Sequence, residues 1–256
     1  MFRTMPLVAF AALTLIAAAA PATISSAAAQ ATGSVVLVHG AFGDGSSWAK
    51  VIPLLEERKL EVIAVQLPLT SLVDDVAATQ RAIARASGPV TLVEHSWGGS
   101  VITEAGTADK VKTLVYVTAF ANDENTNFQE LAGKFPPAPG LAEVVADKDG
   151  FARLSAKGIR EFFAPQAGKA EQALLIATQG PIKAASFGEK VQHAAWMTKP
   201  SWFVLTAKDQ MIQPALQEAM AQKIKAKVTL IESDHAAALS HPKEVAAAII
   251  DAALTK

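Results

Sequence analysis

Three residues that could act together in nucleophilic catalysis occur along the chain in the order serine, aspartate, histidine. Ser96 stands in the hexapeptide EHSWGG, Asp209 in TAKD and His235 in SDH, and each motif follows an apolar run. A serine hydroxyl is a poor nucleophile at neutral pH and needs a base, which a histidine ring can supply. A buried carboxylate can hold that ring in one tautomer and stabilise its protonated form. These residue types therefore predict attack by a serine hydroxyl on a substrate.

The EHSWGG hexapeptide places Ser96 between a predicted strand and a predicted helix, two residues before a glycine. This arrangement resembles the G-x-S-x-G turn, whose strained backbone presents the serine above the carboxyl ends of the strands. Glu94 stands where that pattern has its first glycine. Taken alone, the turn is also compatible with a serine that caps a helix in a dinucleotide-binding protein.

The departure at Glu94 has consequences of its own. A buried, unpaired carboxylate costs free energy or takes up a proton. We expect its negative charge to stabilise the protonated ring of His235 and to oppose the charge that develops during attack by Ser96. Replacement by glycine is then expected to raise stability, keep activity and move the acid limb of the pH profile to lower pH.

The elements that must position these residues are read from the apolar pattern. Six β-branched runs alternate with segments of helical periodicity, and they cover residues 34–38, 61–65, 90–93, 111–117, 202–205 and 228–231. The last two runs are followed by predicted helices at 214–225 and 242–254. Strands separated by helices predict right-handed crossovers and one doubly wound, six-stranded parallel sheet of the α/β class. Ligands bind at the carboxyl ends of such strands, where all three candidate residues lie.

The alternation stops between about residues 121 and 199. No clear strand pattern occurs in this stretch, which contains the sequence PPAP and several phenylalanines. So many aromatic side chains would be costly if they were left in water. We therefore predict a mostly helical cap insertion over one edge of the sheet, with a simple linker as the alternative.

The remaining histidines and acids near the motifs have structural interpretations. His39 is expected to hold its own loop and His95 to pack beside the serine turn, while two further histidines are ordinary polar positions in the cap and the last helix, His193 and His241. Asp123 follows the fourth predicted strand and is the alternative to Asp209 as the acid. The side chain of Asp234 is expected to point away from the neighbouring His235.

Composition excludes several classes of function. The 256 residues include 23 Lys and Arg against 24 Asp and Glu, 51 % hydrophobic residues, five histidines and no cysteine. The net charge of −1, with no basic cluster, argues against nucleic acid as a partner. Without cysteine there is no disulfide framework, thiolate metal site or cysteine nucleophile. No histidine pair has metal-ligand spacing, and we expect neither a metal nor an organic cofactor.

The first 29 residues have the pattern of a secretory signal peptide. A single charge, Arg3, precedes an apolar run over residues 7–20, and small residues lead to an Ala-x-Ala end at Ala29. Cleavage there would leave a domain over residues 30–256, exported to a periplasm or secreted. An uncleaved membrane anchor is the alternative. No other stretch is apolar for long enough to cross a bilayer, so we expect no stable membrane association after cleavage.

Four stretches of the sequence carry a resemblance to a known family. They are VVLVHGAF and GSSWAKVIPLLE within 35–56, LVEHSWGGSVITEAG at 92–106, LTAKDQMIQP at 205–214 and ESDHAAALSHP at 232–242. The chain resembles the α/β-hydrolase superfamily, and within it the small-molecule esterases related to plant methyl esterases and hydroxynitrile lyases. The resemblance implies that Ser96 is the nucleophile, His235 the base and Asp209 the orienting acid.

The same resemblance implies an oxyanion hole and a substrate pocket. The backbone N–H groups of Ala41 and Trp97 would point at the oxygen that gains charge during attack. Phe42 and Trp196 are expected to line the pocket, and the insertion at 121–199 would be the cap that shapes it and limits water.

The expected activity is cleavage of small, mostly apolar carboxylic esters through an acyl-enzyme intermediate. Hydroxynitrile lyases carry Thr and Lys where this chain has Gly40 and Ala236, which favours ester hydrolysis. A cofactor-free perhydrolase and a ligand-binding protein with weak turnover are the alternatives. Arg153 and Arg160 in the cap leave a carboxylate-bearing substrate open. The sequence does not indicate an oligomeric state.

Overall fold

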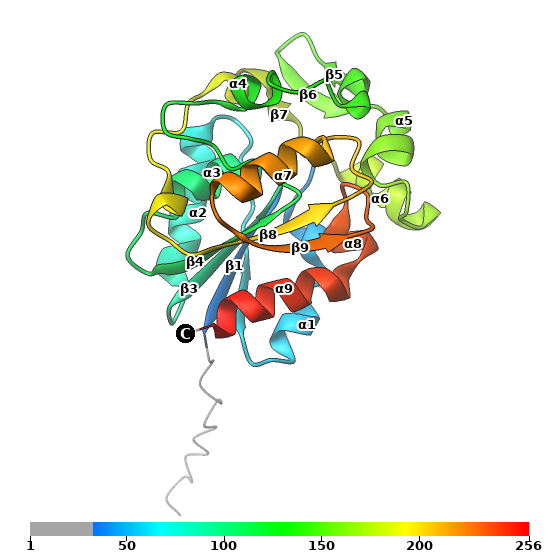
Figure 1. Cartoon of the computed structure of the whole chain (residues 1–256). Coiled ribbons are helices and arrows are strands. Elements are labelled where there is room, and N and C mark those ends of the chain that lie inside the picture. The colour runs from blue at the N-terminus through cyan, green and yellow to red at the C-terminus, as the bar shows by residue number, and fades with distance from the viewer. Residues whose placement is uncertain (1–32, 256) are drawn as a thin grey trace, which may run out of the picture. The chain divides into compact units, whose positions relative to one another are not determined.

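Six parallel strands form the central sheet of the computed structural model, which describes residues 33–255. The signal peptide predicted over residues 1–29 lies outside the described residues. The strands lie in the order β2-β1-β3-β4-β8-β9 (Figure 1). Their bounds are β1 Ser34–Val38, β2 Glu61–Ala64, β3 Val90–His95, β4 Val111–Val117, β8 Ser201–Thr206 and β9 Lys227–Ile231. The prediction of a six-stranded, doubly wound parallel sheet is confirmed.

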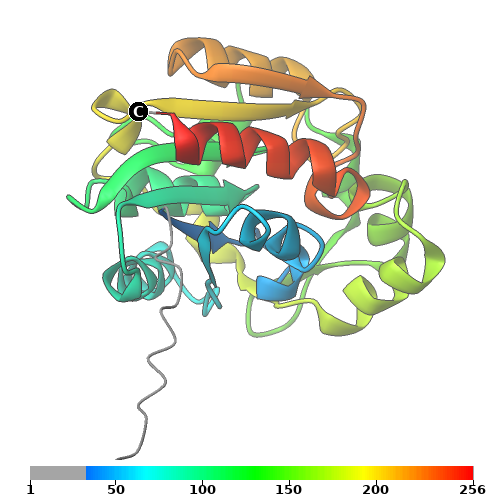
Figure 2. The same cartoon turned by 90° about the horizontal axis from the view of Figure 1, so that it is seen from below.

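Helices cover both faces of the sheet, because the inner strands are apolar on both sides. One core contains Val36, Leu92 and Leu114 with the apolar sides of α2, α3 and α7, and the other contains Val35, Val93 and Val115 with α1 and α9. Figure 2 shows α9 and α1 on the side of the sheet that faces the viewer. The bounds are α1 Ile52–Glu56, α2 Leu72–Arg85, α3 Gly98–Ala105, α7 Pro214–Lys223, α8 Ala237–Ser240 and α9 Pro242–Leu254, with the 3-10 helix η1 at Gly45–Trp48. None of the helices within residues 33–255 has the length and apolar character needed to cross a membrane.

The stretch between β4 and β8 contains strands, which corrects the expectation that it has none. Three short strands form an antiparallel sheet in the order β5-β6-β7. They are β5 Val144–Ala146, β6 Phe151–Leu154 and β7 Ile182–Lys183, and the helices around them are α4 Phe128–Ala132, η2 Pro139–Glu143, α5 Ala156–Gly158, η3 Ile159–Phe163, α6 Lys169–Thr178, η4 Ala184–Gly188 and η5 Ala195–Met197. Strands of two to four residues are too short to show the period-two alternation that identifies a strand in a sequence.

The carboxyl ends of β1, β3, β4, β8 and β9 meet at one edge of the sheet. His39, Ser96 and Thr118 directly follow β1, β3 and β4, while Asp209 and His235 come three and four residues after the ends of β8 and β9. Since parallel strands present their carboxyl ends together, five segments that are far apart in the sequence become neighbours here. The fold thus brings together the three residues that the sequence analysis selected.

The glycine pair after Ser96 lets α3 begin directly against the end of β4. A Cβ atom on Gly99 would lie 2.0 Å from the backbone oxygen of Phe120 and 2.7 Å from its nitrogen. Neither backbone atom can move without disturbing the hydrogen bond that the Phe120 N–H donates to the Ser96 carbonyl, at 3.3 Å. Gly99 is therefore required by close approach of two backbone segments.

We predict that Gly99→Ala lowers the free energy of unfolding by about 2 kcal/mol or more, because the added methyl group overpacks this contact. Thermal unfolding followed by circular dichroism measures the effect. Gly88→Ala is the matched control, since a Cβ there would meet only Ser34 Oγ at 3.7 Å. Equal melting temperatures for the two variants would contradict the packing argument.

Candidate active site

A chain of hydrogen bonds joins Ser96, His235 and Asp209. The Nε2 atom of His235 lies 3.0 Å from the Ser96 hydroxyl, and its Nδ1 atom lies 2.8 Å from Asp209 Oδ2. Because a carboxylate only accepts, Nδ1 carries the proton and donates it, and Nε2 is left to accept from the serine. The structure therefore brings the three predicted residues together in the order that proton transfer from serine to histidine requires.

Asp209 is fully enclosed, yet it is held as a carboxylate. Its Oδ1 accepts from the backbone N–H groups of Met211 at 2.7 Å and Ile212 at 2.9 Å. Its Oδ2 accepts from Gln217 Nε2 at 2.8 Å and from the Thr118 hydroxyl as well as from His235. Burial by itself would raise the pKa of Asp209, but the His235 ring and these donors outweigh burial and lower it below the ordinary value.

The backbone at Ser96 lies in the left-handed region, with φ of 57°. This conformation is rare for a residue with a side chain, and it turns the hydroxyl upward from the strand end. Small neighbours make room for it: a Cβ atom on Gly40 would lie 2.8 Å from Ser96 Cβ, and one on Gly98 would lie 2.9 Å from the His39 carbonyl. The turn has the geometry of the G-x-S-x-G elbow although Glu94 replaces its first glycine.

Two backbone N–H groups border the Ser96 hydroxyl without an acceptor of their own. Within residues 33–255, neither the N–H of Ala41 nor that of Trp97 donates a hydrogen bond. Both residues line the cavity at Ser96. The Trp97 indole is anchored on the far side, where its Nε1 donates to Asp75 Oδ2 at 2.9 Å. These unpaired donors are suited to bind an oxygen that gains negative charge.

A cavity of about 190 Å³ opens beside Ser96. Its wall is apolar apart from Ser96 and His235, and it consists of Ala41, Phe42, Trp97, Phe120, Phe128, Leu141, Val144, Phe163, Phe187, Met211 and Ile212. Phe42 lies in this wall. The expectation that Trp196 lines it is wrong, because the Trp196 indole donates to the backbone carbonyl of Asn122 at 2.7 Å and packs against the core.

Comparison with known proteins assigns the fold family. A family model described as "Alpha/beta hydrolase family" matches residues 35–248, which is most of the chain. The chain belongs to the alpha/beta hydrolase family. Ser96, Asp209 and His235 all fall within the matched residues.

The relatives of this family member include named hydrolases. It is 28 % identical over 245 residues to a pyrethroid hydrolase of Sphingobium wenxiniae, a match that covers 85 % of this chain and 86 % of the relative. It is 25 % identical over 243 residues to the alpha/beta hydrolase nvfD of Aspergillus novofumigatus, covering 86 % and 96 %. The crystal structure of polyneuridine aldehyde esterase superposes with a TM-score of 0.75 at 20 % identity, covering 86 % of this chain and 98 % of the other.

Two histidines near Ser96 occupy structural positions. His39 Nδ1 donates to the Gly40 carbonyl at 2.9 Å, and its Nε2 accepts from the Leu67 N–H at 2.9 Å, so its ring holds two loops together. His95 donates from Nε2 to the backbone carbonyl of His235 at 2.8 Å. Burial lowers the pKa of His95 to about 3, and the neighbouring His235 ring acts in the same direction. His95 therefore supports His235 as an uncharged ring.

The other candidate residues lie away from the serine. Asp123 pairs with Lys223, and Asp234 accepts from the Gln166 N–H at 2.7 Å and from the Ser240 hydroxyl at 3.0 Å. His193 is exposed in the cap, and the ring of His241 meets Gln166 Oε1 at 3.0 Å just before α9. Among the residues that the structure describes, no group of three or more His, Asp or Glu could hold a metal ion.

Three residues that support the site were missed by the sequence analysis. Thr118 and Gln217 bind the Asp209 carboxylate, and Asp75 binds the Trp97 indole. Thr118 stands directly after β4, so its place at the carboxyl edge was a usable signal. Gln217 and Asp75 are polar residues on the buried sides of α7 and α2, and nothing in their spacing indicates a partner.

Glu94 lies in the core beneath α3 and does not line the cavity at Ser96. It is paired in register with Val38 and Tyr116, it is fully buried, and neither of its carboxyl oxygens has a hydrogen-bond partner in the described chain. A Cβ atom on Gly98 in the first turn of α3 would lie 3.2 Å from Glu94 Cβ. Burial raises the pKa of Glu94 well above its ordinary value, opposed only in part by the backbone of Val117.

Full burial without a hydrogen-bond partner favours the neutral form of the Glu94 carboxyl group, and a neutral carboxyl group does not stabilise a protonated His235. The expected shift of the acid limb on replacement by glycine requires a charged Glu94 and stays a prediction. The buried acid instead makes the stability of the fold depend on pH. With its pKa raised in the folded state, Glu94 contributes most stability below the ordinary carboxyl pKa, and this contribution is lost as pH rises toward the folded-state pKa.

We predict that Glu94→Gln gains thermal stability relative to the natural chain as pH rises, because glutamine has no proton to lose. The difference in melting temperature should grow by about 3 °C or more between about pH 5 and pH 8. Differential scanning calorimetry across that range measures it. Glu56→Gln, at an exposed glutamate of α1, is the control and should show a constant difference. If the difference in melting temperature is also constant for Glu94→Gln, the assignment of a neutral buried acid is contradicted.

Proposed function

We propose that the protein is a serine hydrolase that cleaves small, mostly apolar carboxylic esters through an acyl-enzyme intermediate. The observation that carries the proposal is the hydrogen-bond chain from Ser96 through His235 to Asp209, which ends beside two unpaired backbone N–H groups in an apolar cavity. The relatives named as an esterase and as a pyrethroid hydrolase support hydrolysis as the reaction class.

The first half of the reaction forms the acyl-enzyme. Ser96 Oγ attacks the ester carbonyl carbon while its proton passes to His235 Nε2, and the carbonyl oxygen becomes an oxyanion that the Ala41 and Trp97 N–H groups bind. The protonated ring is stabilised by Asp209 across the 2.8 Å hydrogen bond. When the C–O bond breaks, Nε2 returns the proton to the leaving alkoxide, and the alcohol departs.

The second half repeats these steps with water. His235 takes a proton from a water molecule, which attacks the acyl carbon, and the same two N–H groups bind the second oxyanion. Collapse of this intermediate breaks the bond to Ser96 Oγ and returns the proton to it from Nε2. The products are a carboxylic acid and the alcohol, and the protein returns to its starting state.

The wall of the cavity supports an uncharged substrate. It contains no charged side chain, and apolar residues surround Ser96 on every side but that of His235. Arg153 and Arg160, which left a carboxylate-bearing substrate open, are exposed and do not line the cavity. The one departure from the G-x-S-x-G pattern that would favour a weakly active ligand-binding protein is Glu94, and it lies in the core outside the cavity.

We predict that a biotinylated fluorophosphonate labels the protein once, at Ser96, with loss of fluoride. Peptide mass spectrometry locates the label, and a panel of uncharged short-chain esters measures turnover. Ser96→Ala should abolish labelling and reduce kcat by about 10⁶, because attack and proton transfer are lost together.

Asp123→Asn is the matched control for these measurements, since that carboxylate pairs with Lys223 on the surface. It should label and turn over as the natural chain does. Labelling or hydrolysis that persists in Ser96→Ala, with its melting temperature unchanged, is the outcome that rejects the mechanism.

We also propose that residues 1–29 direct export and are then removed, as the signal-peptide pattern of this segment predicts. Expression of the full chain in a Gram-negative bacterium should give a periplasmic protein that begins near Gln30 by intact-mass spectrometry. A chain that starts at Gln30 from the outset is the control and should stay in the cytoplasm. Recovery of an intact 256-residue species from the periplasm contradicts the proposal.

A further inference from the structure

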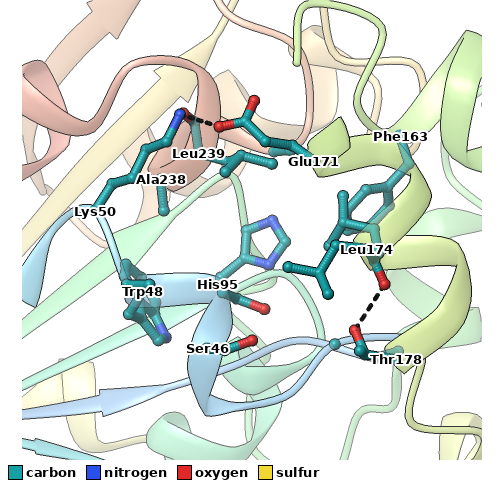
Figure 3. A pocket seen from close by; sticks show the side chains of 16 residues that line it. Ser46, Trp48, Lys50, His95, Phe163, Glu171, Leu174, Thr178, Ala238 and Leu239 are labelled. Carbon is teal, nitrogen blue, oxygen red and sulfur yellow. Dashed lines mark hydrogen bonds and ion pairs between the residues drawn. The ribbon is translucent and has the colours of Figure 1, made fainter. Parts of the chain in front are cut away.

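A second cavity of about 230 Å³ lies next to the one at Ser96. It is enclosed by the segment from η1 to Lys50, by cap helix α6 and by α8 with Leu239 (Figure 3). Ala41 and Phe163 belong to the walls of both cavities. The ring of Phe163 is thus a partition between two spaces, of which only one contains the serine hydroxyl.

Phe163 is fixed against the histidine side of the catalytic cavity. Its ring lies edge-on to His235, with centroids 4.9 Å apart, and edge-on to His95 at 6.0 Å. Its backbone carbonyl accepts from the N–H of Ala236 at 3.1 Å. The second cavity is lined by His95, Ala236 and Ala238, so it lies on the far side of Phe163, next to the residues that surround the catalytic ring.

The proton transfer in the proposed mechanism indicates which half of an ester lies on the Phe163 side of the cavity. In the proposed mechanism His235 Nε2 gives its proton to the leaving oxygen, which must therefore lie within hydrogen-bond reach of the ring. The group attached to this oxygen extends past the imidazole toward Phe163. The acyl half stays bonded to Ser96, and we expect it to extend toward the part of the wall that Phe128 and Phe187 form.

The chemistry of the second cavity suits an uncharged, apolar group. Leu174, Leu175 and Leu239 supply much of its wall. The two charged residues at its mouth, Lys50 and Glu171, form an ion pair with each other, and Lys50 also donates to the Leu239 carbonyl at 3.2 Å. Figure 3 shows this pair between the loop and α6, so neither charge is left for a ligand.

We propose that the second cavity is the subsite for the alcohol half of the substrate, and that Phe163 sets the size of alcohol accepted. With the ring in its present position the serine accepts esters of small alcohols. Rotation or removal of the ring joins the two cavities and admits longer, apolar alcohols. This inference rests on the proposed ester hydrolysis and names the part of the substrate that determines specificity.

Two matched series of esters test it. In one the acyl group is acetyl and the alcohol grows from ethyl to octyl, and in the other the alcohol is methyl and the acyl group grows from acetyl to octanoyl. Phe163→Ala should raise the ratio of kcat/KM for octyl acetate to that for ethyl acetate by about tenfold or more, because methylenes become buried in the joined cavity. The ratio of methyl octanoate to methyl acetate should stay within about twofold.

Phe128→Ala is the matched control, because it removes an equal ring from the opposite wall. It should raise the methyl octanoate ratio and leave the octyl acetate ratio unchanged. Phe163→Leu, which removes less of the buried ring, should show a smaller gain in the same direction as Phe163→Ala. A gain for long acyl groups, or an equal gain in both series, overturns the assignment.

Binding of 1-octanol tests the cavity without catalysis. In the Phe163→Leu protein 1-octanol should raise the melting temperature, since a ligand that binds only the folded state stabilises it. Adding Leu175→Trp, which fills the cavity from α6, should remove that rise. An undiminished rise in the double variant also overturns the subsite. Absence of fluorophosphonate labelling would instead reject the proposed function, so the two failures are distinguishable.

Discussion

The hydrogen bond between Asp209 and His235 is the contact on which the arrangement of the whole site depends. A carboxylate in a closed interior loses its hydration, and this loss is tolerated only where other groups replace the water. Here backbone N–H groups of the turn after β8, a threonine after β4 and a glutamine from α7 all donate to Asp209. The carboxylate therefore keeps its charge, holds the proton on His235 Nδ1 and leaves Nε2 free to accept from Ser96.

At the carboxyl end of β3, the backbone of one residue of this hydrogen-bond chain, Ser96, is strained. The left-handed backbone of Ser96 costs about 1–3 kcal/mol on general grounds. Its carbonyl accepts from the N–H groups of Gly99 at 3.1 Å and Phe120 at 3.3 Å, and its own N–H donates to Val117 at 3.4 Å. These bonds link the turn to α3 and to the end of β4. These three hydrogen bonds help to hold the serine in an unfavourable conformation.

Much of this architecture could be predicted from the sequence because it repeats simple patterns. Six apolar runs predicted the sheet, and the positions of Ser96, Asp209 and His235 after three of them predicted which residues meet. The cap strands were not predicted, because strands of two to four residues are too short to show an alternation of apolar and polar residues. Trp196 was misplaced because a tryptophan near a site satisfies its N–H and buries its ring equally well in the core.

Glu94 shows a different limit of prediction from sequence. Its proximity to Ser96 along the chain suggested an electrostatic effect on the reaction, but successive side chains of a strand point to opposite faces of the sheet. Glu94 is two residues from Leu92 and shares its face, so it enters the core with Val38 and Tyr116. Distance along the sequence is a poor guide to electrostatic coupling where a strand ends in a sharp turn.

Another buried acid, Asp75, connects the floor of the cavity at Ser96 to its cap. Asp75 Oδ2 accepts from the Trp97 indole, and its Oδ1 accepts from the N–H of Leu69 at 2.8 Å. The carbonyl of Leu69 in turn accepts from the N–H of Lys183 in β7 at 2.8 Å, while the Trp97 ring meets Phe187 of the cap edge-on. One carboxyl group on α2 thus positions both the residue whose N–H faces the proposed oxyanion and the cap segment above it. The cap therefore contacts Trp97 by two routes, one through Asp75 and Leu69 to Lys183 and one directly between the Phe187 and Trp97 rings.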